Sequence, residues 1–290
     1  MFPFCIQVET LTMKHYTLLG LCLLITLFSF GQYPAFTVQK TGKGKPVFFL
    51  PGFITPGSVW NETIRQLPGK HQTHVFTYAG FGGTSAIDTP WYSTIKRELL
   101  LYIQKEKLSN LTIVGHSMGG TLAMDIAASL PGKVDKLLLV DALPNMRELM
   151  LPGVAADKIM YNSPYNQQVL QMKAEAFQQM ATMMAGGMTA NKEKADTIRN
   201  WIINTDRKTY VYGYTDLLKL DLFADLARIR ANTLILGATF PTMEIAKATL
   251  EKQYANLHSK QIAMAPDSRH FIMFDQPEWF YAQVNAFLKQ

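Results

Sequence analysis

Short apolar runs bounded by turn residues alternate with amphipathic stretches along most of the chain. Such runs are typical of buried strands, and the longer stretches between them have helical spacing. Strands that alternate with helices predict a mostly parallel sheet covered by helices on both faces. The predicted strands are 36–39, 46–50, 74–78, 111–115, 136–140, 233–236 and 261–264. The predicted helices between them are 59–66, 92–107, 118–130, 243–255 and 278–288.

One connection between predicted strands is far longer than a normal loop. It extends from Ala142 to Ala231 and contains helical patterns over 168–184 and 191–204. We therefore predict an inserted helical subdomain. It holds eight of the fifteen methionines, whose flexible side chains suit apolar acyl or alkyl groups. Methionines at helical spacing more often form only the core of the subdomain itself.

The first 31 residues differ from the rest of the chain. A short basic start at Lys14 precedes an apolar run from Tyr16 to Phe30, which ends in small residues. A bilayer-spanning helix needs about 20 apolar residues, so this shorter run favours a cleavable signal peptide, residues 1–31. We expect export to the periplasm or the medium. An uncleaved N-terminal membrane anchor is the alternative; otherwise no stable span is expected.

Composition excludes several classes of function. The chain has 290 residues, 48% of them hydrophobic, which suffices for one large core over 32–290. Both cysteines lie before residue 32, so the exported part would have no disulfide. The net charge of +6 comes from scattered Lys and Arg without aromatic stacking motifs, which argues against nucleic-acid binding. No metal-ligand motif is present, and we expect neither metal nor cofactor. Composition does not set the oligomeric state.

The segment around Ser117 combines a strand, a tight turn and a helix. An apolar run over 111–114 leads into G-H-S-M-G at 115–119, and a helix-forming run follows from Gly120. A serine on such a strand-to-helix turn needs glycine two residues before and after it, since there is almost no room for side chains. The pattern predicts Ser117 as a nucleophile near the free N–H groups of a helix N-terminus.

This motif in its alternating context resembles the α/β-hydrolase fold family, in the single-domain branch with a helical cap between strands 6 and 7 of the family's count. The resemblance extends from about Phe36 to the C-terminus. It implies a nucleophile, an acid and a histidine in that order along the chain. It also implies that the insertion at about 142–231 is a lid over the nucleophile.

His270 occupies the place of the family's histidine. It follows the last predicted strand in a loop, and residues 270–280 then read, as in the family, a few apolar residues, an acid and Pro-Glu with an aromatic residue. An imidazole at this place can take the proton of the serine hydroxyl. His116 adjoins Ser117, but we expect it to point away from the nucleophile.

The acid is less well defined by the sequence. Many relatives carry it in a Gly-x-x-Asp turn after the strand that is here 233–236, where this chain has Phe240. Other family members carry it after the preceding strand, where Asp141 stands in this chain. A carboxylate there can orient the imidazole and stabilise its cation. Glu244 is the alternative, because it follows Phe240 closely and has a long side chain.

An oxyanion hole needs two N–H donors. Met118 should provide one at the start of its helix. The resemblance assigns the other to the backbone of Phe53, in the sequence L-P-G-F at 50–53, although Pro51 replaces the histidine that relatives usually have.

Together these features predict an exported serine hydrolase that acts on small apolar carboxylic esters through an acyl-enzyme, with Ser117, His270 and Asp141 as its triad. A serine at the elbow argues against haloalkane dehalogenase and epoxide hydrolase chemistry. Carbon–carbon bond hydrolysis and aminopeptidase action remain open, because similar scaffolds perform them with the same triad. A non-catalytic ligand-binding protein is a third possibility, which the missing acid after Gly237 favours.

Overall fold

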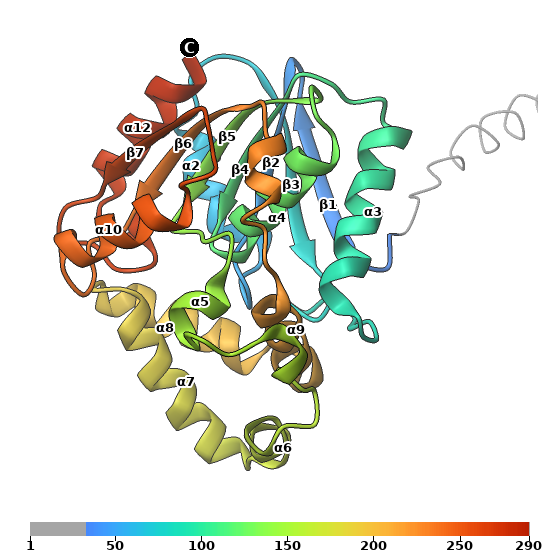
Figure 1. Ribbon diagram of the computed structural model, residues 1–290, viewed down its shortest axis with the longest axis vertical. Coiled ribbons are helices and arrows are strands. Elements are labelled where there is room, and N and C mark those ends of the chain that lie inside the picture. Colours follow the sequence, from blue (N-terminus) through green and yellow to red (C-terminus); the bar gives the residue numbers. More distant parts are fainter. Residues whose placement is uncertain (1–32, 290) are drawn as a thin grey trace, which may run out of the picture. The chain divides into compact units, whose positions relative to one another are not determined.

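A seven-stranded sheet forms the centre of the computed structural model, which describes residues 33–289 (Figure 1). The strand order is β1-β3-β2-β4-β5-β6-β7; β1 is antiparallel to β3 and every other neighbouring pair is parallel. The strands are β1 (Phe36–Gly42), β2 (Lys45–Leu50), β3 (His71–Tyr78), β4 (Leu111–His116), β5 (Val134–Val140), β6 (Asn232–Gly237) and β7 (Lys260–Met264). The predicted α/β fold with a mostly parallel sheet is confirmed. The predicted signal peptide lies outside the described residues.

The central strands are buried on both faces of the sheet. Every residue of β4 is buried, as are the last four of β2 and of β5. Helices pack on both sides of the sheet, so these strands need continuous apolar runs (Figure 1). The covering helices are α2 (Asn61–Arg65), α3 (Trp91–Lys105), α4 (Met118–Ser129), α10 (Met243–Gln253), α11 (Ile272–Asp275) and α12 (Pro277–Lys289).

The long segment between β5 and β6 is helical, as its pattern predicts. This insertion lies between β5 and β6 here, and the family's count numbers the two flanking strands 6 and 7. Its α-helices are α5 (Met146–Met150), α6 (Pro164–Gln171), α7 (Ala174–Met188), α8 (Lys192–Ile203) and α9 (Arg207–Lys219).

The single helix predicted over 168–184 is wrong, because the backbone is extended at Met172 and Lys173 and separates α6 from α7. Arg207 stabilises the break. Its guanidinium donates to the carbonyls of Val169 and Met172 where α6 ends (2.9 and 3.1 Å).

Helix α9 attaches the insertion to the core. The Asp206 N–H donates to the carbonyl of Gly80, after β3 (2.9 Å). The carboxylate of Asp216 accepts the N–H of Tyr92 (3.0 Å) in the first turn of α3, whose N-cap residue, Pro90, makes no side-chain cap. The insertion is therefore held at the carboxyl ends of the strands, where the loops of a parallel sheet carry functional groups.

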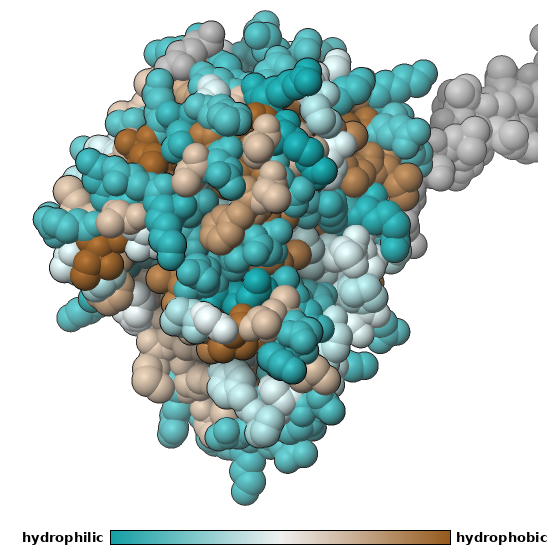
Figure 2. All heavy atoms as spheres, in the orientation of Figure 1, coloured by the Kyte–Doolittle hydropathy of each residue, from teal (hydrophilic) through white to brown (hydrophobic). Residues whose placement is uncertain are grey.

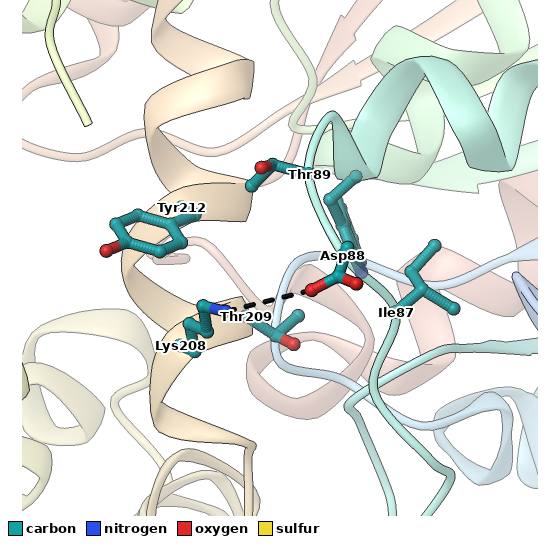
Figure 3. Close-up of a pocket in the computed structure, with 7 residues that line it drawn as sticks. Ile87, Asp88, Thr89, Lys208, Thr209 and Tyr212 are labelled. Atoms are coloured by element: carbon teal, nitrogen blue, oxygen red, sulfur yellow. Dashed lines mark ion pairs between the residues drawn. The ribbon is translucent and has the colours of Figure 1, made fainter.

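The contact between α9 and the loop before α3 is nearly closed. Figure 3 shows Lys208 and Thr209 directed toward this loop, with an ion pair between Lys208 and Asp88 (3.7 Å). The space left between them is about 10 Å³, close to what a single water molecule needs. This crevice is too small for an organic substrate.

One face of the molecule is seen to be mainly polar (Figure 2). On the face shown in Figure 2, hydrophilic residues dominate and apolar ones appear singly or in small groups. Among residues 33–289, none of the helices is both long and apolar enough to cross a bilayer.

The turn from β4 to α4 is packed so closely that it requires glycine. An ideal Cβ at Gly119 would lie 2.2 Å from the carbonyl oxygen of Leu50, and one at Gly115 would lie 2.4 Å from the carbonyl oxygen of Gly119. Because the obstructing atoms are backbone, no side-chain rotation relieves these contacts. The steric reason for the two glycines of the motif is thus visible in the structure.

We predict that Gly119→Ala lowers the free energy of unfolding by about 1–3 kcal/mol, the usual cost of overpacking. Urea denaturation at pH 7 measures it. Gly187→Ala is the matched control, since a Cβ there meets no atom within 4 Å in α7 and alanine favours the helix by up to about 1 kcal/mol. Equal effects of the two substitutions would contradict the steric explanation.

Candidate active site

Ser117 lies between β4 and α4 in a strained backbone conformation, with φ 53° and ψ −124°. Such a conformation costs a residue with a Cβ about 1–3 kcal/mol, so the surroundings must hold it. The Ser117 N–H donates to the carbonyl of Val140 (2.8 Å), and its own carbonyl accepts the N–H groups of Gly120 and Thr121 (2.8 and 3.1 Å). These bonds tie the serine to β5 on one side and to α4 on the other.

Asp141 and His270 are brought together from two different strand ends. The Nδ1 atom of His270, after β7, lies 2.6 Å from Oδ2 of Asp141, after β5. The other oxygen of Asp141 accepts the N–H of Ala238 (3.0 Å), and the Asp141 N–H donates to the carbonyl of Leu236 (2.8 Å). The carboxylate is thus fixed by residues of and after β6. With its proton on Nδ1, the imidazole keeps Nε2 as an acceptor.

The Nε2 atom of His270 and the hydroxyl of Ser117 have no hydrogen-bond partner among residues 33–289. The two side chains are therefore not joined directly in this structure. Hydrogen bonds between catalytic groups are often long in a protein without substrate and shorten when substrate binds. Ser117 and His270 are both half-buried.

Glu244, the alternative acid, does not contact His270. It lies exposed in the first turn of α10, where its own N–H and the hydroxyl of Thr242 lower the pKa of its carboxyl group. Of the two candidate acids, the structure brings only Asp141 to the imidazole.

The two candidate oxyanion donors flank the serine. Met118 is the first residue of α4, and Phe53 follows β2. The N–H groups of both have no acceptor within the described part of the chain. The loop before Phe53 lies against the elbow, since an ideal Cβ on Gly52 would be 3.3 Å from the Cβ of Ser117. The start of α4 and the loop that carries Phe53 therefore both adjoin Ser117.

Aromatic side chains from the core and the insertion surround Phe53. Its ring meets Phe81 and Trp91 of the core and Tyr210 and Tyr214 of α9, with centroids 5.0 to 6.1 Å apart. Burial raises the pKa of both tyrosines, so their rings stay neutral. This side of the site is apolar.

His116 is a buried residue of the site to which sequence reasoning assigned no role. Its ring lies 4.6 Å from those of His270 and Phe271, and its Nε2 donates to the carbonyl of His270 (3.0 Å). Burial, and secondarily the His270 ring, lowers the pKa of His116 to about 3, so it is a neutral donor at pH 7. Its position next to Ser117 was the only signal in the sequence.

Comparison with known proteins shows the family of the chain. Residues 47–283 match the model of the alpha/beta hydrolase family. The chain belongs to the α/β-hydrolase family. Among its relatives, the pimeloyl-[acyl-carrier protein] methyl ester esterase of Aeromonas salmonicida is 22% identical over 263 residues, which cover 87% of this chain and 98% of that protein. The AB hydrolase superfamily protein YisY of Bacillus subtilis is 28% identical over 211 residues, which cover 69% and 75%.

Solved structures share the fold of this α/β-hydrolase. An esterase from Exiguobacterium antarcticum superposes with a TM-score of 0.72 at 21% identity, over 88% of this chain and 96% of that one. An enol-lactonase from Burkholderia xenovorans superposes with a TM-score of 0.69 at 14% identity, over the same shares. Among the described residues of this α/β-hydrolase, no group of three or more His, Cys, Asp and Glu side chains is placed to hold a metal ion.

The lowered pKa of His116 predicts a loss of stability in acid. The unfolded chain binds a proton near pH 6.5 and the folded one only near pH 3, so the free energy of unfolding falls as the pH drops through this window. Between pH 7 and 5 we expect His116 to account for a loss of about 2 kcal/mol. Urea denaturation at pH 7 and pH 5 measures the free energy of unfolding. Between these pH values it should fall by about 2 kcal/mol less in His116→Gln than in the wild type. His74, whose pKa burial lowers to about 4, contributes equally in both proteins. Identical pH dependence would contradict the assignment.

Proposed function

We propose that this α/β-hydrolase is a serine hydrolase that cleaves carboxylic esters, with Ser117 as nucleophile, His270 as base and then acid, and Asp141 as the orienting carboxylate. The observation that carries the proposal is the 2.6 Å hydrogen bond between Asp141 and His270 at the edge of the sheet where Ser117 stands on its strained turn. The family supports it, and several relatives of this chain are named as esterases.

The reaction follows from the proton positions. Asp141 holds the proton on Nδ1 of His270, so Nε2 can take the proton of Ser117 as its Oγ attacks the ester carbonyl. The N–H groups of Phe53 and Met118 stabilise the resulting oxyanion. The imidazolium returns its proton to the departing alcohol, which leaves an acyl-enzyme. Water, deprotonated by His270, then attacks the acyl carbon and releases the acid and the serine.

The substrate class is a small ester with an apolar part. The aromatic rings around Phe53 supply an apolar wall beside one proposed oxyanion donor. In this proposal the inserted helices form a lid, because α9 contributes two of these rings.

The ligand-binding alternative depended on the missing acid after Gly237. The contact between Asp141 and His270 supplies a carboxylate from elsewhere, so this argument for a non-catalytic protein no longer holds.

The chain from Gln32 onward should hydrolyse p-nitrophenyl acetate, butyrate or octanoate, and Ser117→Ala should reduce kcat by about 10³-fold or more. A fluorophosphonate should label the wild-type protein at Ser117, as located by peptide mass spectrometry, and leave the variant unlabelled. A folded protein that neither turns over any of these esters nor reacts with the fluorophosphonate would refute the proposal.

Asp141→Asn should lower kcat by up to about 10⁴-fold, since the amide no longer fixes the imidazole tautomer. Glu244→Gln is the matched control, which we expect within about threefold of wild type. Steady-state kinetics on the best ester measures both variants. An active Asp141→Asn beside an inactive Glu244→Gln would transfer the role to Glu244.

A further inference from the structure

Both neighbours of His270 are hydrogen-bonded through their backbone N–H groups. The N–H of Phe271 donates to the carbonyl of Met188 at the end of α7 (3.0 Å), which satisfies a group that the helix leaves free. The N–H of Arg269 donates to Oδ2 of Asp275 (2.8 Å), in α11. The loop of residues 265–271, hereafter the His270 loop, is thus held on either side of the imidazole.

The carboxylate of Asp275 also holds the turn of residues 189–191, hereafter the α7–α8 turn. Its Oδ1 accepts the hydroxyl of Thr189 and the N–H groups of Ala190 and Asn191 (2.9 and 3.3 Å to the nitrogens). One half-buried side chain therefore joins the His270 loop to the inserted helices, with one oxygen on each segment. Hydrogen bonds to an ionised carboxylate are about twice as strong as neutral ones.

Other contacts join the same two segments. The guanidinium of Arg269 donates to the carbonyls of Gly186 and Thr189. The ring of Trp201, on α8, meets the rings of Phe271 and Phe274 at 6.3 and 6.2 Å, and these two rings are stacked on each other at 5.3 Å. Helices α7 and α8 therefore rest directly on the segment that carries His270.

The insertion does not need Asp275 to stay attached to the core. Helix α9 is held independently by the bonds from Asp206 to Gly80 and from Tyr92 to Asp216. The consequence of losing the Asp275 bonds is therefore local to the His270 loop and the α7–α8 turn.

We propose that Asp275 is a positioning residue for His270: it fixes the backbone before the imidazole through the Arg269 N–H, and its own orientation is set by the α7–α8 turn. The placement of the base toward Ser117 thereby depends on docking of the inserted helices. This inference rests on the proposed function. A misplacement of a reacting group by about 1 Å can cost about 100-fold in rate, so a bond one residue away from the base is enough to control it.

Asp275→Asn tests the link, because the amide has the same size but loses one acceptor oxygen. We expect kcat on p-nitrophenyl butyrate to fall about 10- to 100-fold with KM within about threefold, since the substrate contacts are unchanged. Glu278→Gln is the matched control; it removes the same charge three residues away at an exposed position of α12. Wild-type kcat in Asp275→Asn would overturn the inference.

Thr189→Val removes the hydroxyl that donates to Asp275 at the other end of the link. It keeps a side chain of similar shape at this buried position and leaves the backbone carbonyl that Arg269 contacts in place. We expect a smaller fall in kcat, about three- to tenfold. In the double variant with Asp275→Asn the rate should equal that of Asp275→Asn alone, because both act through one carboxylate. If the fall in kcat of the double variant equals the product of the two single effects, the coupling is refuted.

Hydrogen exchange gives a readout that does not need activity. Amides 269–271 should exchange faster in Asp275→Asn than in the wild type or Glu278→Gln, while those of β4 remain unchanged. An active wild type with an unaffected Asp275→Asn refutes only the positioning role. An inactive wild type refutes the proposed function. Hydrogen exchange then tests separately whether Asp275 holds the His270 loop, and unchanged exchange in Asp275→Asn would refute that contact as well.

Discussion

The close approach of helix α4 to the end of β2 is the constraint on which the site depends. The carbonyl oxygens of Leu50 and Pro51 lie where a Cβ of residue 119 would be, so α4 can begin here only with glycine at that position. The same approach places the loop before Phe53 beside Ser117. A single steric requirement thus brings the serine, the start of α4 and the loop after β2 together.

The second element of the site comes from the order of the strands. Asp141 and His270 are 129 residues apart in the chain, yet β5, β6 and β7 are neighbours, and their carboxyl ends meet at one edge. The backbone after β6 orients the carboxylate through the N–H of Ala238. His116 adds a neutral hydrogen bond to the carbonyl of His270 from β4. Four parallel strands therefore contribute to the placement of one imidazole.

The insertion is attached to this arrangement in two different ways. Helix α9 is bound to the core through α3 and the loop after β3, and its aromatic rings meet Phe53. Helices α7 and α8 instead rest on the segment from Arg269 to Asp275 through a shared carboxylate and through the ring of Trp201, which meets Phe271 and Phe274. The part of the insertion that faces the apolar wall and the part that faces the histidine are therefore distinct.

The sequence alone determined the sheet, the glycine-flanked turn at Ser117 and the helical character of the segment between β5 and β6. Strands buried on both faces must be continuous apolar runs, and the glycines around Ser117 follow from contacts close to the turn. The sequence favoured Asp141 over Glu244 because Asp141 directly follows an apolar strand run, but only the tertiary structure shows that Asp141 meets His270. The tertiary structure also decided the break at Met172, which Arg207 stabilises, and the contacts of His116 and Asp275. These contacts join side chains from elements that are distant in the chain. The periodicity of apolar residues along the sequence does not predict such contacts.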